Sequence, residues 1–353
     1  MPAIMRSACS ALVLFGLGFV TGWSLGCGRD RGRNGDGGPA DRALESAVDV
    51  MGTDQSDGTS DGGMNSLPVL QHGERYDDES RQHLIDPATA RLADYSCRGS
   101  VTAPARGPSV GFSIEVRDFQ SGSPVPDVCL RLYADNSVPN ESSCISSGGV
   151  VTGASGLASV NGPANGWFSV RVFPVAGVTP SSTVVQSIIH NQAAPSAAGG
   201  LATVTAVSQA TLDLIPTIYG FPRQAGTTVI VGRVFACSEP SEGVYGASIR
   251  VARDDGSYID EGTSRTDPHY RYFDGSQFPE PSRRYTHVDG LYIVTQIPPG
   301  TGSVFVEAWG RSTTTSMPVI IGCERARVFS DSVTEIEIGP LRRDGPPCPG
   351  LAL

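Results

Sequence analysis

The stretch from Val229 to Gly310 decides the fold, and it contains the segments Val229-Ile-Val-Gly-Arg-Val234, Gly246-Ala-Ser-Ile-Arg-Val251, Asp289-Gly-Leu-Tyr-Ile-Val294 and Ile297-Pro-Pro-Gly300. Each segment is short and rich in β-branched or aromatic residues, and glycine, proline and aspartate separate one from the next. Such runs are typical of the strands of an antiparallel sandwich. The sequence therefore predicts an all-β fold.

The order and spacing of these four segments resemble the carboxypeptidase regulatory-like module, a transthyretin-like β-sandwich of secreted proteins. The resemblance implies a two-layer sandwich in this part of the chain. It does not imply one activity, because such a scaffold is used in many roles.

A second, degenerate copy of the pattern lies upstream. Phe112–Val116 and Val128–Tyr133 alternate between apolar and polar residues, and Trp167–Phe173 forms a further strand-like run after a glycine-containing turn. This order repeats that of the downstream module. We therefore predict two tandem transthyretin-like or Ig-like β-sandwiches, residues 94–222 and 223–341, followed by a C-terminal tail of residues 342–353.

A short helix is predicted in the connection between the two sandwiches. Ser208 can cap its first turn, and Pro216 follows the apolar residues Leu212 to Ile215. We expect this helix to close an open end of the first sandwich.

The N-terminus is typical of an export signal. Arg6 precedes the apolar run Ala11–Val20, which is short for a membrane-spanning helix, since that needs about 20 apolar residues. Gly26-Cys27 resembles the cleavage site of bacterial lipoproteins, and this resemblance implies a signal peptide of residues 1–26 with Cys27 as the lipidated residue. An uncleaved signal anchor and ordinary cleaved secretion stay open as alternatives.

Residues 27–93 are rich in glycine, aspartate and serine and contain few large apolar residues. Such a composition predicts a disordered tether. Together, the signal segment, Cys27 and the tether predict an exported protein of the cell envelope that is anchored to a membrane by lipid. The outer membrane is favoured over the inner one.

Six cysteines remain when Cys9 and Cys27 are assigned to the signal segment and the lipid: Cys97, Cys129, Cys144, Cys237, Cys323 and Cys348. An even set in an oxidising compartment predicts disulfides. Locality favours Cys129–Cys144 within the first sandwich and Cys237–Cys323 within the second, with Cys97–Cys348 tying the ends together. Free thiols or metal ligands are the alternative, although no C-x-x-C spacing is present.

The charge balance excludes several classes of function. The net charge of −10 argues against binding to a nucleic acid, which requires a basic surface. All 26 cations are arginine, because the sequence contains no lysine. Schiff-base chemistry, a P-loop lysine and lysine-based isopeptide crosslinks are therefore impossible.

Hydrolase motifs are absent as well. Gly153-Ala-Ser-Gly156 is one residue short of a nucleophile elbow and lies in a β-rich region, whereas the elbow requires a strand-to-helix corner. The five histidines are scattered and form no zinc motif. We predict no cofactor and no metal.

One enzyme family shares the scaffold. Asp254-Asp-Gly-Ser-Tyr258 resembles the segment of intradiol ring-cleavage dioxygenases that carries an iron-ligating tyrosine. Those enzymes need a His-x-His pair after the Pro-Gly turn, and here Ser303–Arg311 contains no histidine. Tyr258, Tyr270, Tyr272, His269 and His287 are the residues from which a substitute site would have to be built.

An insertion between Gly262 and Arg284 is the most distinctive segment. Long loops on a rigid scaffold often carry binding residues, and aromatic rings flanked by arginine suit a sugar or a peptide. The candidate ligand-binding residues, including one just before the insertion, are Tyr258, Arg265, Tyr270, Arg271, Tyr272, Phe273 and Phe278. The alternative is a hairpin whose aromatic side chains cover one sheet.

The sequence thus predicts a non-catalytic envelope lipoprotein that binds a carbohydrate, a peptide or an envelope protein, or that serves structural display. The alternative is a metal-dependent, dioxygenase-like or hydrolytic enzyme with an unrecognised site on the second module.

Overall fold

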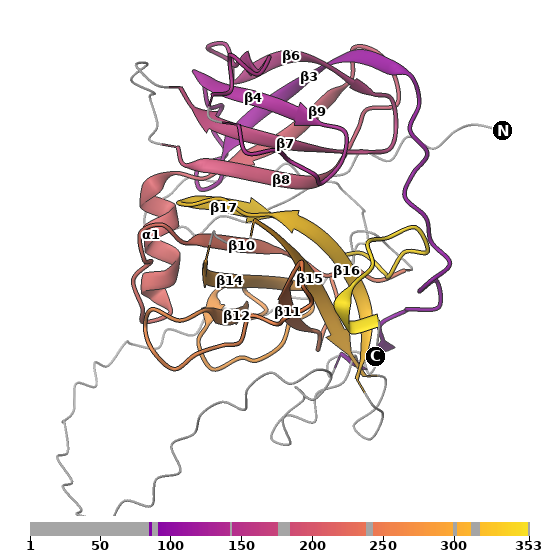
Figure 1. The fold of residues 1–353 in the computed structure, drawn as a ribbon, viewed down its shortest axis with the longest axis vertical. Coiled ribbons are helices and arrows are strands. Elements are labelled where there is room, and N and C mark those ends of the chain that lie inside the picture. The colour runs from indigo at the N-terminus through magenta and orange to yellow at the C-terminus, as the bar shows by residue number, and fades with distance from the viewer. Residues whose placement is uncertain are drawn as a thin grey trace, which may run out of the picture. The chain divides into compact units, whose positions relative to one another are not determined.

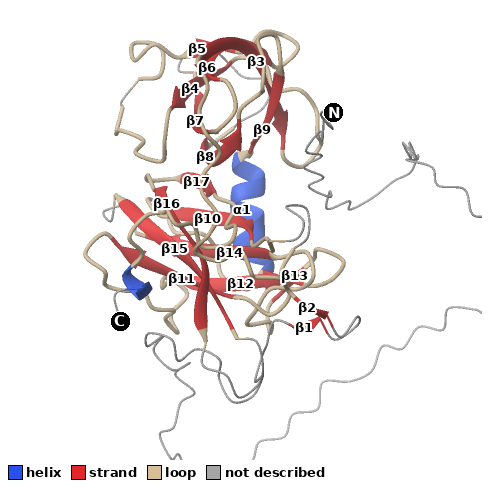
Figure 2. Ribbon diagram, turned by 90° about the vertical axis from the view of Figure 1, so that its right-hand side faces the viewer, coloured by secondary structure: helices blue, strands red, loops and turns tan. Residues whose placement is uncertain are grey.

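The computed structural model describes residues 85–86, 91–141, 143–175, 184–237, 243–298, 302–311 and 318–351. The predicted signal segment, Cys27 and most of the tether lie outside these residues. The described part is all-β, as the sequence predicts, and contains a single α-helix within these ranges, α1 (Gln209–Ile218). Figure 2 shows how strands dominate this part of the chain.

The largest sheet has nine strands and runs through both halves of the described chain. Its order is β13 (Pro279–Glu280), β12 (His269–Phe273), β14 (Leu291–Ile297), β10 (Thr228–Arg233), β17 (Ser332–Glu335), β8 (Gln186–Ala193), β7 (Trp167–Pro174), β4 (Val128–Tyr133) and β5 (Val150–Val151). The sequence predicts two tandem sandwiches, and the structure joins its two halves through this one sheet.

Two three-stranded sheets complete the sandwiches. In the first half the order is β6 (Leu157–Pro163), β3 (Ser109–Asp118) and β9 (Leu201–Ala206); in the second half it is β11 (Ser248–Arg253), β15 (Ser303–Gly310) and β16 (Val319–Arg327). A small ribbon of β1 (Ile85–Asp86) and β2 (Arg91–Leu92) precedes them.

Strand β17 joins the halves, and it lies between β8 and β10 in Figure 1. It pairs in parallel with both neighbours, so that Val333 lies opposite Ser187 on one side and Val229 on the other. Buried hydroxyls support the pairing, because Thr228 Oγ1 donates to the Ser332 carbonyl oxygen at 2.9 Å. The chain therefore returns from the second half to complete the edge of the first.

The two hydrophobic cores lie on opposite faces of the nine-stranded sheet. Residues paired across strands share a face, and Ile230, Thr334 and Ile188 form one such row. Ile230 belongs to the core of the second half. The adjacent row contains Val231 and Ile189, and Ile189 belongs to the core of the first half. Each sandwich thus packs its core against one face of the nine-stranded sheet, and other segments cover the opposite face of the same strands.

Helix α1 covers the face that the second sandwich leaves free. Ser208 caps the helix, its Oγ accepting a hydrogen bond from the Thr211 amide at 3.1 Å. Leu212 packs with Val229 of β10 and Val333 of β17 in a separate buried cluster. The predicted cap is confirmed, but the expected position is wrong, because the helix lies on a sheet face and not at an end of the first sandwich.

All six predicted disulfide cysteines are paired. Cys129 bonds Cys144 across a separation of 15 residues, the pair that proximity in sequence favours. The other two predicted pairs are wrong: the structure joins Cys97 to Cys237 and Cys323 to Cys348. A backbone contact explains the first of these pairs. The Cys237 amide donates to the Asp94 carbonyl oxygen and so places Cys97 beside Cys237.

These pairings can be tested by peptide mapping. An arginine lies between every two consecutive cysteines of the six, so trypsin separates them all. We expect mass spectrometry of the unreduced digest to find crosslinked peptides for Cys97–Cys237, Cys129–Cys144 and Cys323–Cys348. A peptide that joins Cys237 to Cys323 would contradict the observed arrangement.

Candidate functional site

The predicted aromatic patch does not form on the surface. Tyr270 and Tyr272 lie on β12, which pairs with β14 as a regular strand, and each is only 1% exposed. The Tyr272 hydroxyl accepts a hydrogen bond from the Ile249 amide at 2.9 Å, and the Tyr270 hydroxyl donates to the Ile259 carbonyl oxygen. Both tyrosines therefore tie the two sheets of the second sandwich together and are buried rather than exposed at the surface.

The remaining members of the patch are dispersed. Arg271 is buried in an ion pair with Glu261, and the Phe273 ring lies edge-on to Tyr219 at 6.4 Å. Phe278 and Arg265 are exposed in loops. The physical reason is alternation: a strand sends successive side chains to opposite faces, so the four adjacent residues Tyr270 to Phe273 cannot share one surface.

Tyr258 has a different partner. Its hydroxyl donates to Glu307 Oε2 at 2.9 Å, and the Arg250 guanidinium lies 3.7 Å from the centre of its ring. It packs on the three-stranded sheet of the second half. In the described part of the chain no three residues among His, Cys, Asp and Glu are placed to hold a metal ion together.

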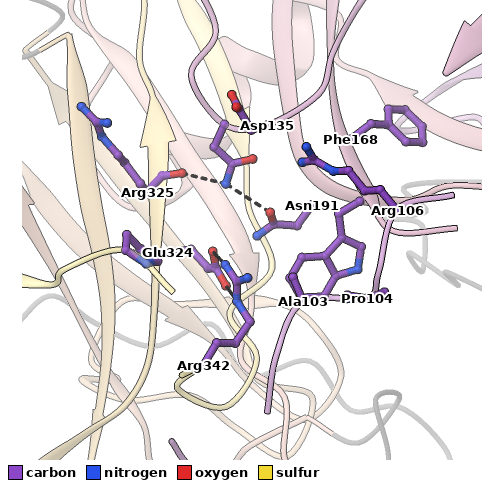
Figure 3. A pocket seen from close by; sticks show the side chains of 12 residues that line it. Ala103, Pro104, Arg106, Asp135, Phe168, Asn191, Glu324, Arg325 and Arg342 are labelled. Carbon is purple, nitrogen blue, oxygen red and sulfur yellow. Dashed lines mark hydrogen bonds and ion pairs between the residues drawn. The ribbon is translucent and has the colours of Figure 1, made fainter. Parts of the chain in front are cut away.

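A cleft of about 200 Å³ opens where the two halves meet, and we call it the junction cleft (Figure 3). Residues of the first half on its wall are Ala103, Pro104, Arg106, Asp135, Asn136, Trp167, Phe168 and Asn191; those of the second half are Glu324, Arg325, Arg342 and Pro346. The cleft combines a half-buried indole with amide, guanidinium and carboxylate groups.

A buried ion pair forms one wall of the junction cleft. Glu324 is 3% exposed, and its two carboxylate oxygens accept from Arg342 Nε at 3.1 Å and Nη2 at 2.9 Å. Burial raises the pKa of Glu324, while Arg342 and a hydrogen bond from Asn191 oppose that rise. The Arg342 guanidinium also lies 4.8 Å from the centre of the Trp167 ring, which fixes the indole in the wall.

Two asparagines connect the halves beside this pair, as the dashed lines in Figure 3 show. Asn136 Nδ2 donates to Asn191 Oδ1 at 3.1 Å and to the Arg325 carbonyl oxygen at 2.9 Å. The Ser169 hydroxyl donates to Asn136 Oδ1 at 2.8 Å. The side chains behind the cleft are therefore held in fixed positions before any ligand arrives.

Ser169 and His190 resemble a nucleophile and its base, but their protons are placed the wrong way. His190 Nε2 accepts from the Arg327 amide at 3.0 Å, so the proton of the neutral ring is on Nδ1. Nδ1 is 2.9 Å from Ser169 Oγ and must donate to it. A serine that accepts from the histidine and donates to Asn136 is not deprotonated by that histidine.

Sequence reasoning missed the junction cleft because its residues come from six separate segments. Trp167 is the one signal that was available, since it is the single tryptophan of the predicted first sandwich, residues 94–222. Its partner Arg342 lies in the predicted C-terminal tail, where the Arg343 amide donates to the Val101 carbonyl oxygen at 2.8 Å. The tail is thus part of the folded unit.

No protein-family model matches the chain, and a search of curated proteins finds no match either. Solved structures with some likeness include the TIE protein of Bacillus anthracis (7% identity, TM-score 0.19, 66% of this chain and 34% of that one). The shaft pilin SpaA of Lactobacillus rhamnosus GG has 10% identity and a TM-score of 0.19 (67% and 98%). The minor pilin GBS52 of Streptococcus agalactiae has 9% identity and a TM-score of 0.18 (66% and 96%).

This chain spans about a third of the length of the Bacillus protein. TM-scores this low carry no argument about fold or function. Across the described ranges, no helix has both the length and the apolar character needed to cross a membrane.

The buried histidine predicts a pH dependence. Burial lowers the pKa of His190 from 6.5 to about 3, so below pH 6.5 the unfolded chain binds a proton that the folded protein excludes. The free energy of unfolding should therefore fall by about 1.4 kcal/mol for each pH unit lost between pH 6.5 and pH 3. We expect His190→Gln to remove this slope in denaturant titrations.

The quantity to compare is the difference in unfolding free energy between wild type and His190→Gln at each pH. Other titrating groups cancel in this difference, including Glu335, whose pKa burial raises to about 7. Ser169→Ala keeps the imidazole and should keep the slope. A difference that does not change between pH 6.5 and pH 4 would show that His190 is not held neutral.

Proposed function

We propose that the protein is a non-catalytic, exported and lipid-anchored envelope protein that binds a carbohydrate in the junction cleft. The observation that carries this proposal is the Trp167 indole, which is held in the wall of the cleft by Arg342 beside polar side chains from both halves. An apolar ring face beside fixed hydrogen-bonding groups suits a sugar, which has both C–H faces and hydroxyl groups.

The polar groups of the cleft suit hydroxyl groups of either hydrogen-bonding role. Asp135 supplies an acceptor, and Arg106 and Arg325 supply donors on the first and second half of the wall. The Arg106 guanidinium donates to the Ala134 carbonyl oxygen, which holds the side chain at the rim. A sugar hydroxyl both donates and accepts, so it can use each of these neighbours.

The volume limits the ligand. Sites for drug-sized molecules measure about 300–1,000 Å³, and the junction cleft has about 200 Å³. It therefore takes one sugar residue, such as the end of a longer chain, with the rest of the ligand in solvent. The side chain of a peptide is the competing occupant of the same space.

The fold supports a role in display at the envelope. One sheet continues through both halves, and three disulfides close the described part of the chain. A rigid unit of this kind on the predicted tether of residues 27–93 would hold the cleft away from a membrane surface. In this proposal the second half is a carboxypeptidase regulatory-like module, the resemblance stated for its sequence, and the outer membrane is the favoured location.

The carbohydrate proposal is tested by substituting the indole. We expect Trp167→Ala to raise the Kd for a glycan ligand roughly tenfold, which corresponds to about 1.4 kcal/mol, because the stacking surface is lost. Binding is measured on a glycan array and then by titration calorimetry with the best glycan. Equal thermal melting of the two proteins checks that the variant folds, and Trp167→Phe serves where alanine destabilises.

Phe278→Ala is the matched control. Phe278 is an aromatic side chain with 50% of its surface exposed, it belongs to the patch that the sequence predicts, and it lies outside the junction cleft. We expect unchanged glycan binding in this variant. Loss of binding in Phe278→Ala with retention in Trp167→Ala would reject the junction cleft in favour of the insertion.

The anchoring proposal is tested at Cys27. We expect Cys27→Ser to block lipid attachment and to leave the precursor unprocessed or release the protein from membranes, as judged by fractionation and by incorporation of labelled palmitate. Membrane association and normal cleavage in Cys27→Ser would contradict the lipoprotein assignment. Cys9→Ser, which changes the other cysteine of this segment, is the control and should incorporate lipid normally.

A further inference from the structure

A second cavity of about 290 Å³ lies beside the β16–β17 connection, and we call it the arginine pocket. Arg171 of β7 and Gln186 of β8 line it from the first half, and Arg327 and Phe329 line it from the second. It shares no residue with the junction cleft.

Arg171 is built into this pocket. It is 3% exposed, and its guanidinium carbon lies 4.1 Å from the centre of the Phe173 ring and 3.9 Å from that of Phe329. The two rings hold the planar group between them, and Nη2 donates to Gln186 Oε1 at 2.7 Å. The cation is therefore fixed in position and shielded from bulk water.

Some side chains that line the pocket contain buried donors without a protein acceptor. A guanidinium can only donate, so the Gln186 oxygen must face Arg171, and the amide nitrogen of Gln186 points elsewhere. This buried Nε2 has no hydrogen-bond partner in the described structure, and neither has the buried Nε of Arg171 or of Arg327. Buried donors are normally paired, so this concentration of donors favours an acceptor-rich ligand.

The charges around the pocket also favour a ligand that is negatively charged. Arg171 lies close to both Arg327 and Glu141, and Glu141 also lies close to Arg131. Glu141 is already engaged, since it lies 3.6 Å from Arg131 Nε and accepts from the Tyr133 hydroxyl at 2.6 Å. Burial lowers the pKa of Arg171, Tyr133 and Glu141 oppose this change, and the charge of Arg327 adds to it. The surplus is cationic in a chain whose net charge is −10.

We propose that the arginine pocket binds an oxyanion, either a free inorganic anion such as sulfate or the carboxylate of an acidic sugar. An oxyanion offers several acceptor lone pairs and a negative charge, and arginine is the residue that recognises such groups in a fixed geometry. The site is independent of the carbohydrate site proposed for the junction cleft.

The test measures binding of sulfate and of glucuronate to the purified protein by titration calorimetry at constant ionic strength, with methyl glucoside as the neutral probe. Binding of sulfate and glucuronate alike supports a general oxyanion site, and binding of glucuronate alone supports an acidic sugar. Failure of both anions to bind overturns the proposal. Glucuronate that binds wild type and Trp167→Ala equally is not held by the junction cleft.

Two variants locate the site. Arg327→Gln should raise the Kd for the anion roughly tenfold or more, because one charged donor is lost. Arg117→Gln is the matched control: Arg117 pairs with Glu115 and lines neither cavity, so its Kd should equal that of wild type. Equal losses in both variants would overturn the proposal.

Gln186→Glu tests the pocket without removing a cation. The new carboxylate would still accept from Arg171 and would supply the negative charge from within the protein. We expect this variant to fold, to melt at the same or a higher temperature than wild type, and to lose anion binding. Anion binding as tight as in wild type would contradict the proposed site.

Discussion

The pairing of β17 with β8 on one side and β10 on the other is the constraint on which the rest of the structure depends. This four-residue strand is in the second half of the sequence, yet it completes the edge of the first sandwich. Because both pairings are parallel, the strand must arrive by a crossover and not by a hairpin. The crossover comes from β16 in the opposite sheet. Without β17, each half would expose a sheet edge with unpaired amides.

Both cavities follow from that crossover. The end of β16 and the residues after it place Glu324 and Arg325 in the junction cleft, and Arg327 and Phe329 in the arginine pocket. The His190 ring accepts from the Arg327 amide and so fixes the backbone between the two. A ligand in either cavity would therefore contact both halves. Such a site is more rigid than one on an exposed loop, because strands on both sides support its residues.

The sequence was sufficient where local pattern decides the structure. Alternation in Phe112–Val116 and Val128–Tyr133 predicts two strands, and the structure contains the first within β3 and the second as β4. Ser332–Glu335 lacks such a pattern, so its central place in the sheet is set by partners far away in sequence. The predicted pairing of Cys97 was wrong for the same reason, since its partner is also far away in sequence. Cys97 and Cys237 are 140 residues apart, and only the folded chain brings their Cα atoms to 5.9 Å.

The aromatic insertion shows why residue type alone misplaces a site. Tyrosine is common on binding surfaces because it offers an apolar ring and a polar tip, and the same two properties suit it to a core that contains free backbone groups. Tyr270 and Tyr272 take the second role, since their hydroxyls form hydrogen bonds with backbone groups of the facing segment.

Arg171 is the opposite case, because a charged residue is expected at the surface and this one is buried. It is buried between two aromatic rings, and its cationic group is kept where few acids can neutralise it. Burying a charged group costs free energy because the group loses its contact with water. Recognition of an anion explains this burial better than stability alone.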